Sequence, residues 1–422
     1  MSSYIILEKR QVRMMFRYEV KKVFAKTGGK IALLLLAGVL ILSCCFAADI
    51  YWVNENGEQE YGIAAVRKLR EAQKEWTGTL DEEKLQQVIE ELNKINATPQ
   101  AHSEDVRESN IAFGWQQGVM GIRWLMVGAY SEGFQHSDYY RPNSLVPEDA
   151  SAFYSNRIRL LKEWLADEKD NAYYKFTDVE KEFLINRYET LETPLYYDYL
   201  EGWQQLFMWY SMIAMLTMII LGYLVSGIFS NEFQWKADAI FFTATHGRNK
   251  AVAAKVKAGF SIVTVIYWVM ILLYTAFVLM YFGADGAACL IQASYNSWKS
   301  FYNITIWQEY LLLVIGGYIG CLFISFLVMF ISAKGRSAVV AVMTPVLLIF
   351  LPSFVGEINN PAVDKILGLL PDQLLQVNMA LKFFNLYELG GKVVGAVPIL
   401  FVLYGVLALA LMPMVYKVYR RS

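Results

Sequence analysis

Six long runs of residues without a single charge constrain the fold of this chain more than any other feature. The runs are 18 to 29 residues long and cover 31–48, 202–230, 258–284, 310–333, 337–356 and 393–416. A helix of about 20 apolar residues crosses the hydrocarbon layer of a bilayer. Because that layer offers no water to backbone polar groups, the runs should be helical. The alternative is helices buried in a large soluble core, which seldom contain uncharged stretches of this length.

The overall composition agrees with a membrane protein. Hydrophobic residues make up 56% of the chain. Charged residues make up only 18%, below the roughly 25% that is usual for soluble domains. We therefore expect an all-α membrane protein with six transmembrane helices.

The first run also has the position of a secretory signal peptide. Its lead of 30 residues carries eight Lys and Arg, so it is longer and more basic than a usual signal n-region. Cys44 follows Leu42-Ser43, which is a weak likeness to a lipoprotein cleavage site. The five later runs would anchor the chain in either case, and we interpret the first run as a transmembrane helix.

Lys and Arg are distributed unequally among the segments that connect the runs. With the N-terminus placed inside, the short inner segments carry 18 Lys and Arg and the short outer segments carry four. Basic residues are enriched on the cytoplasmic side of membrane proteins. The sequence therefore predicts a multi-pass protein of the plasma membrane with both termini cytoplasmic. A net charge of −1 gives no indication of nucleic-acid binding.

These two patterns divide the chain into segments, and the longest connection forms a domain of its own. The segments are 1–30, a cytoplasmic amphipathic connecting helix; 31–53, the first transmembrane helix; 54–201, an extracellular domain; 202–230, the second transmembrane helix; 231–257, a cytoplasmic loop; 258–284, 310–333 and 337–356, the third to fifth transmembrane helices; 357–392, short extracellular helices; 393–416, the sixth transmembrane helix; and 417–422, a cytoplasmic tail.

The extracellular domain should be mainly helical. Charge-rich helical periodicity covers 60–76 and 81–95, and 151–166 and 178–191 are further candidates. The stretch 99–150 is interrupted by Gly, Pro and Ser and permits no assignment. In the later extracellular segment, 363–370 and 372–387 are candidates for short helices.

The N-terminal segment has the pattern of an amphipathic helix. Apolar residues recur every four positions at Val12, Phe16, Val20 and Phe24, among basic residues. We expect Gly28-Gly29 to end this helix before the membrane. A basic amphipathic helix commonly lies in the membrane interface, and a simple basic topology signal is a compatible alternative.

The patterns of several functional classes are missing from the sequence. No run contains an acid or base of the kind that marks proton and ion pathways. The chain has no HExxH, paired CxxC or GxSxG pattern, and no phosphate-binding Gly-x-x-x-x-Gly-Lys loop. We therefore expect no enzyme activity and no cofactor in this chain. If the protein performs work, ATP is bound by a partner subunit.

The cytoplasmic loop 231–257 is the most informative connection. Glu232 lies where the second run ends, a short amphipathic helix is predicted over 236–242, and a turn ends at Arg248 before Lys255. The loop also contains large apolar residues, namely Phe233, Trp235, Ile240, Phe241 and Phe242. A generic basic connector is the alternative interpretation, but it would not need these residues. An amphipathic helix that docks into a partner's groove would need them.

This arrangement resembles the permease subunits of ABC exporters of the ABC-2 type, also called type V. In that family the second span ends in an acidic residue and is followed by a coupling helix, a turn ending in Arg, and a Lys. Glu232, the stretch 236–242, Arg248 and Lys255 match these positions. The likeness extends to the basic N-terminal helix, the six spans, and Leu369-Leu370-Pro371 before the last span. The motif covers about 25 residues, and the domain at 54–201 departs from many members.

The resemblance implies partners and site residues. Two permeases, as two copies or as related subunits, would pair among membrane lipids above two separate ABC ATPase subunits. The residues that it assigns to ATPase coupling are Glu232, Trp235, Lys236, Phe241 and Arg248. Glu232 and Arg248 would hold the base of the coupling helix through charge-assisted hydrogen bonds.

The resemblance also implies a substrate path along the dimer interface, lined mainly by the second and fifth spans. Met208, Met212 and Met215 of the second span would give it a flexible apolar surface. Lipid-facing or packing methionines are the alternative. The uncharged path favours an amphiphilic cargo, such as a peptide, a lipid-like molecule or a drug. Two rival functions are a membrane-anchored receptor or assembly protein that acts through its extracellular domain, and a polytopic enzyme.

Overall fold

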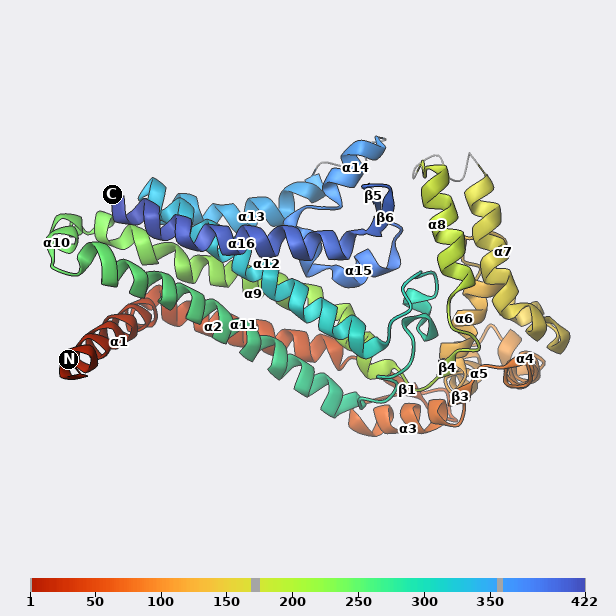
Figure 1. Ribbon diagram of the computed structural model, residues 1–422. Coiled ribbons are helices and arrows are strands. Elements are labelled where there is room, and N and C mark those ends of the chain that lie inside the picture. The colour runs from red at the N-terminus through yellow and green to blue at the C-terminus, as the bar shows by residue number, and fades with distance from the viewer. Residues whose placement is uncertain (1, 168–174, 355–359, 422) are drawn as a thin grey trace.

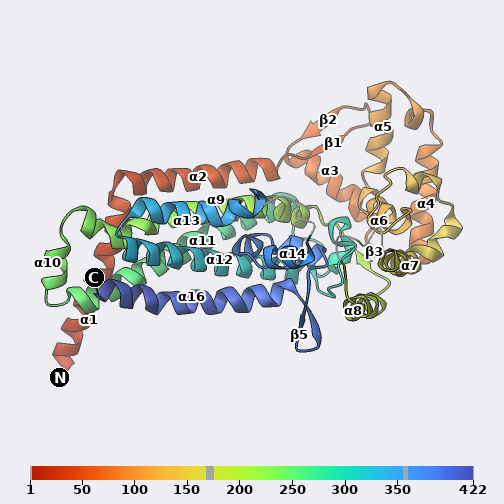
Figure 2. The same ribbon diagram turned by 90° about the horizontal axis from the view of Figure 1, so that it is seen from above.

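The computed structural model describes residues 2–167, 175–354 and 360–421, which form mainly helices (Figure 1). Long helices lie side by side in a bundle, and shorter helices form a separate domain at one end of it (Figure 1, Figure 2). Both termini lie at the opposite end of the bundle. We refer to these as the domain end and the terminal end.

The bundle contains the long apolar helices that the sequence predicts. Its helices are α1 (Ser2–Ala25), α2 (Thr27–Ala47), α9 (Glu201–Gln234), α11 (Val252–Phe282), α12 (Ile306–Gly335), α13 (Ala338–Phe354) and α16 (Ala396–Arg421). Within the described residues, five are long and apolar enough to cross a membrane, namely α2, α9, α11 with the π-helical turn η4 (Gly247–Ala251) before it, α12 and α16. The chain is therefore an all-α, multi-pass membrane protein.

The described part of the fifth predicted span, 337–356, is helical. This part, α13, has 17 residues and a length of about 26 Å, compared with a hydrocarbon layer of ~30 Å. Pro345 and Pro352 lie inside it, where proline removes a helical hydrogen bond. Positions 355 and 356 lie outside the described residues. A membrane crossing by α13 stays a proposal.

Several predicted boundaries differ in the structure. The first apolar helix ends at Ala47, and part of the predicted span, Tyr51–Val53, is strand β1, which pairs antiparallel with β2 (Gln59–Tyr61). The N-terminal helix ends at Ala25 because Lys26 is extended, with ψ 150°. Gly28 and Gly29 do not break it. They lie in the first turn of α2, where a Cβ on Gly28 would collide with the Tyr223 hydroxyl.

The segment before the last span is more varied than two short helices. It contains α14 (Pro361–Leu367), the 3₁₀ turn η7 (Pro371–Leu375), α15 (Val377–Lys382), and a hairpin of β5 (Leu386–Leu389) and β6 (Lys392–Gly395). Gly390 and Gly391 form the hairpin turn with φ of 58° and 77°. Positive φ at two successive glycines is the requirement of a type I′ hairpin turn, so the Gly-Gly pair is a local signal for a hairpin that the expectation of two helices overlooks.

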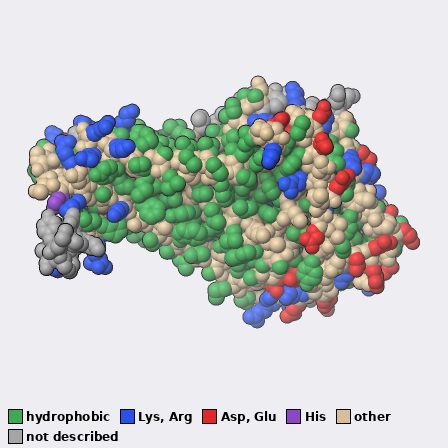
Figure 3. All heavy atoms as spheres, in the orientation of Figure 1, with side chains coloured by type: hydrophobic (Ala, Val, Ile, Leu, Met, Phe, Trp, Pro, Cys, Tyr) green, Lys and Arg blue, Asp and Glu red, His purple; other side chains and the backbone are tan. Residues whose placement is uncertain are grey.

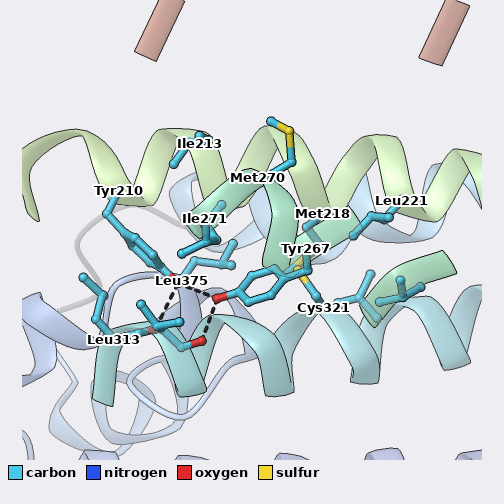
Figure 4. Close-up of a cluster of buried hydrophobic side chains, with 14 of the residues drawn as sticks. Tyr210, Ile213, Met218, Leu221, Tyr267, Met270, Ile271, Leu313, Cys321 and Leu375 are labelled. Atoms are coloured by element: carbon cyan, nitrogen blue, oxygen red, sulfur yellow. Dashed lines mark hydrogen bonds between the residues drawn. The ribbon is translucent and has the colours of Figure 1, made fainter. Parts of the chain in front are cut away.

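Helix α9 forms the centre of the bundle and contacts α2, α11, α12 and α13. In the middle, the hydroxyls of Tyr210 (α9) and Tyr267 (α11) lie 2.7 Å apart (Figure 4). Tyr210 donates to the Leu313 carbonyl at 3.0 Å, and Tyr267 donates to the Val314 carbonyl at 2.6 Å. Both carbonyls belong to α12. A buried hydroxyl without a partner would be costly, so this network fixes how the three helices meet.

Gly317 of α12 makes room for the two tyrosines. A Cβ there would lie 2.7 Å from the Tyr267 hydroxyl and even closer to that of Tyr210. We predict that Gly317→Ala lowers stability by about 1–3 kcal/mol, because neither tyrosine can move without losing its hydrogen bond. Thermal unfolding in detergent checks this. Gly405→Ala in α16 is the matched control, since nothing lies within 4 Å of its Cβ, and an equal loss in both variants would contradict the prediction.

The described part of the domain contains six α-helices. They are α3 (Ile63–Lys74), α4 (Glu82–Asn96), α5 (Val106–Gln116), α6 (Met120–Tyr130), α7 (Phe153–Ala166) and α8 (Asp178–Glu189), with the 3₁₀ turns η1 (Pro99–His102), η2 (Arg141–Ser144) and η3 (Pro147–Ala152), and with β3 (Gly78–Thr79) paired to β4 (Tyr196–Tyr197). The four helices that periodicity predicted are present. α5 and α6 occupy the unassigned stretch, and α6 is buried on most sides, so it shows no amphipathic pattern.

Connections at the domain end of the bundle complete the cores of the domain. Trp298, after the 3₁₀ turns η5 (Ile291–Ala293) and η6 (Tyr295–Ser297), is buried with α4, α6 and η3. Phe301 and Phe384 are buried with α7 and α8. The domain therefore does not fold around its own residues alone. Its position on the bundle follows from shared hydrophobic cores.

Ion pairs also hold the domain to the bundle. Asp285, just after α11, lies 2.7 Å from Lys74 Nζ and 2.6 Å from Arg70 Nη2, both on α3. Partial burial alone would raise the pKa of Asp285, but Lys74 and Arg70 hold that pKa below its ordinary value. The pairs therefore stabilise the protein above the unfolded pKa of about 3.9 and are lost as pH falls through the lower folded pKa.

We predict that Asp285→Asn loosens α3 from the bundle at neutral pH. The expected cost is about 1 kcal/mol, because both basic partners are partly exposed to solvent. Faster hydrogen exchange in α3 measures it, and the difference from the natural chain should vanish at acidic pH. Glu189→Gln, which removes the exposed ion pair between α8 and Lys162 of α7, is the control and should leave α3 unchanged. Unchanged exchange in Asp285→Asn would contradict the prediction.

Candidate functional site

Charged side chains from three helices meet a tyrosine of a fourth at the terminal end of the bundle. Glu232 (α9) contacts Lys22 (α1) through Oε1, which also accepts from Lys255 Nζ (α11) at 2.8 Å. Its Oε2 accepts from the Tyr419 hydroxyl (α16) at 3.1 Å. Lys255 Nζ also lies 3.1 Å from Glu19 Oε2. We call Glu19, Lys22, Glu232, Lys255 and Tyr419 the charge cluster.

The charge cluster is buried and electrically balanced. Lys255 is 0% exposed and Glu232 is 5% exposed. The Lys255 ammonium uses all three of its donors, since it also bonds the Ile228 carbonyl at 2.8 Å. Two carboxylates face two ammonium groups, so the charges of the cluster cancel. Removing one member of such a set leaves an uncompensated buried charge.

Helix positions explain why these groups need each other. Glu232 lies in the last turn of α9, where the helix dipole disfavours an anion. Lys255 lies near the start of α11, after the π-helical turn η4 that precedes it without a break. The ammonium of Lys255 therefore offsets the unfavourable position of the Glu232 carboxylate.

An aromatic cluster joins the loop to the C-terminal helix. The loop contains the short helix α10 (Asp238–Thr243), which has six residues. The rings of Phe233, Phe241 and Phe242 lie 5.8, 5.9 and 5.3 Å from the ring of Tyr419. Tyr419 is thus the point where the aromatic cluster meets the charge cluster. Tyr419 therefore links α10 to the Glu232 carboxylate.

An apolar groove lies between α1 and α10 and opens to solvent. It has a volume of about 650 Å³, and Met14, Tyr18, Trp235, Ile240 and Phe241 are among its lining residues. Ile240 is 77% exposed. Lys22 and Lys26 lie over the Trp235 ring at 5.1 and 4.3 Å, an arrangement in which cations are attracted to the ring face. Basic side chains are abundant on this end of the molecule (Figure 3).

The structure brings some of the predicted coupling residues together and separates others. Glu232 and Phe241 contact the two clusters described above. Trp235 and Lys236 are exposed, and Lys236 has the left-handed φ of 55°. Arg248 does not contact Glu232, whose carboxylate is occupied by Lys22 and Lys255. It donates to the Arg420 carbonyl at 3.2 Å and lies over the Phe242 ring of α10, so its role at the base of the coupling helix stays a prediction.

Sequence reasoning missed Glu19, Lys22 and Tyr419 as members of the site. It also placed Glu232 and Lys255 in a loop, whereas both lie in the ends of long helices. One signal was available. Glu19 falls within the apolar stripe of α1, three residues after Phe16, where an acid needs a partner. Its closest ammonium belongs to Lys255, 236 positions away, and no local pattern indicates that pairing.

The three methionines of the predicted substrate path have different surroundings. Met208 is 59% exposed near the domain end. Met212 is half-buried, and Met215 packs against the main hydrophobic core. α9 and α13, the second and fifth predicted spans, are neighbours within this chain, and a Cβ on Gly222 would lie 2.9 Å from Pro345.

Comparisons with known proteins do not identify the site. Within the described residues, no group of three His, Cys, Asp or Glu side chains is arranged to hold a metal ion. No protein-family model, no curated protein and no solved structure matches the chain. The functional interpretation therefore depends on the residues of the site and their geometry.

We predict that Lys255→Met destabilises the protein by about 3–5 kcal/mol, because Glu19 and Glu232 would face only one ammonium. Lys257→Met, an exposed neighbour on the same helix, is the matched control and should be near neutral. The double variant Glu19→Gln/Lys255→Met restores the charge balance and should recover part of the loss. Thermal unfolding of the four proteins measures this. Equal stability of the two single variants would contradict the prediction.

Proposed function

We propose that this chain is the membrane-spanning permease subunit of an ATP-driven ABC exporter of the ABC-2 type. The observation that carries the proposal is the connection of α10 to four bundle helices through Tyr419 and Glu232. A short apolar helix outside the spans, fixed to the ends of those spans, is suited to transmit a push from a bound partner. The family resemblance of the same loop points to ABC ATPase subunits as that partner.

The groove between α1 and α10 supports docking of a protein. Ile240 and Trp235 are exposed on a surface that also carries basic side chains. Exposed apolar residues within a charged surface are typical of protein interfaces. In the proposed complex the ATPase subunits contact this groove, bind ATP and close. The charge cluster would then carry that movement into α1, α9, α11 and α16.

The proposed topology has six spans, with α13 as the fifth and both termini in the cytoplasm. The enrichment of Lys and Arg at the terminal end supports this orientation in the plasma membrane (Figure 3), and the domain would then be extracellular. α2 exposes Leu34, Leu35 and Ile41, a surface suited to lipid or to a second permease. The cargo in this proposal is amphiphilic and passes near α9 and α13.

A second candidate is a membrane-anchored receptor or assembly protein that acts through its domain. A cavity of about 660 Å³ between β1, α3 and α5 favours it, since Trp52, Trp76 and Trp115 line it with Glu60 and Glu91. Six predicted spans exceed what anchoring requires, so we prefer the exporter.

We predict that Ile240→Glu separates the chain from its ATPase without unfolding it. The side chain is 77% exposed, so stability should stay unchanged, whereas a buried charge in a docked interface would weaken binding at least tenfold. The tagged chain is purified from its native membranes, and co-eluting ATPase activity is measured.

Val106→Glu is the control, because Val106 is similarly exposed but lies on the domain. It should retain the ATPase. If no ATP-binding cassette protein co-purifies with the natural chain, the exporter proposal is wrong. If Ile240→Glu retains as much ATPase as Val106→Glu, the groove is not the docking surface.

A further inference from the structure

A cavity with both apolar and polar walls lies at the domain end, away from the charge cluster. It has a volume of about 260 Å³ and lies between the start of α9, the turn η6, the start of α12, and α15. Gln204, Met208, Asn296, Glu309, Asn378 and Lys382 are among its lining residues. Its walls also include Trp203, Phe207 and Met379, so charged, amide and apolar groups face one space.

Two residues that line this cavity each have a buried acceptor atom without a donor in the described part of the chain. Glu309 is 1% exposed, and its Oε1 has no hydrogen-bond partner among the described residues. Asn378 is 3% exposed, and its Oδ1 likewise has none there. A buried acceptor without a donor loses roughly 1–3 kcal/mol, and more when it is charged. Two such atoms on one cavity indicate a missing group that donates hydrogen bonds.

The charge of the cavity indicates the sign of that group. Glu309 lies in the first turn of α12, where the helix dipole favours an anion. Lys382 lines the same cavity and acts on Glu309 electrostatically, but no ion pair joins them in the described part of the chain. Lys382 is partly exposed and can be hydrated, whereas the Glu309 carboxylate cannot. The unmet requirement is therefore for hydrogen-bond donors, and a cation that donates hydrogen bonds would complement the ionised form of Glu309.

A second chamber continues the cavity toward the domain. It has a volume of about 400 Å³ and shares Leu200, Gln204, Met208 and Asn296 with the first. It adds the carboxylate of Glu201 and the rings of Trp124 and Tyr295. Aromatic faces and a further acid suit a positively charged ligand. The exposed Met208 lines both chambers, so the apolar part of a ligand could extend along α9 from one chamber to the other.

We propose that this cavity binds the primary ammonium group of a cationic amphiphile, with Glu309 and Asn378 as hydrogen-bond acceptors and the apolar part of the ligand along Phe207, Met208 and Met379. An ammonium group offers three donors and no acceptor, which matches two acceptors without donors. The inference deepens the proposed export function by naming a cargo class. It rests on that function only in calling the ligand a cargo, because binding to the cavity requires no ATPase.

The test is equilibrium binding of monodansylcadaverine, a fluorescent primary amine, to the purified chain in phosphatidylcholine nanodiscs. Empty nanodiscs supply the background. We expect Glu309→Gln to weaken binding at least tenfold and Asn378→Leu several-fold. Lys382→Gln should strengthen binding, because it removes a competing cation. Glu388→Gln, an exposed acid outside the cavity, is the matched control and should bind like the natural chain.

The uncharged N-acetyl derivative tests the ammonium group without altering the protein, so the result does not depend on whether a variant folds. It should bind at least tenfold more weakly than the amine. Equal binding of the two compounds, or equal binding to Glu309→Gln, would overturn the proposal. Loss of binding in Lys382→Gln would also overturn it, by indicating a zwitterionic ligand. If the amine does not bind, the cavity proposal is wrong but ATPase co-purification is still expected. If no ATPase co-purifies, the exporter proposal is wrong but binding of the amine is still expected.

Discussion

Glu232 accepts from Lys255 and Tyr419 and contacts Lys22, so one carboxylate joins α9 to α11, α16 and α1. The helices meet where the apolar spans end and the chain becomes basic. Charges at such a position cannot be left unpaired without a large desolvation penalty. The relative positions of four helices at the terminal end depend on this one set of contacts.

In the middle of the bundle, hydrogen bonds of buried tyrosines replace the ion pairs. There the apolar surfaces of α9, α11 and α12 have no directional preference, and the Tyr210–Tyr267 network supplies one (Figure 4). Gly317 admits the two rings at the point where they reach α12. Hydrophobic burial brings these helices together, and a few hydrogen bonds decide their register.

The domain and the bundle share their cores at the opposite end. Trp298, Phe301 and Phe384 come from bundle connections but are buried among domain helices, and Asp285 adds ion pairs to α3. A movement of these connections would therefore shift the packing of the domain helices. The cavity that contains Glu309 lies in this shared region, where α9, α12 and α15 meet the turn η6.

The sequence by itself determined the class of the protein, the long helices, their approximate limits and four of the domain helices, because uncharged runs and helical periodicity are local properties of the chain. It also singled out Glu232 and Phe241. Only the tertiary structure decided the partners of Glu232. Lys22 and Tyr419 lie about 200 residues away on either side, and Arg248, which is closer in sequence, is turned toward Arg420. The pairing of charges depends on which helix ends meet in space, and no spacing along the chain encodes that.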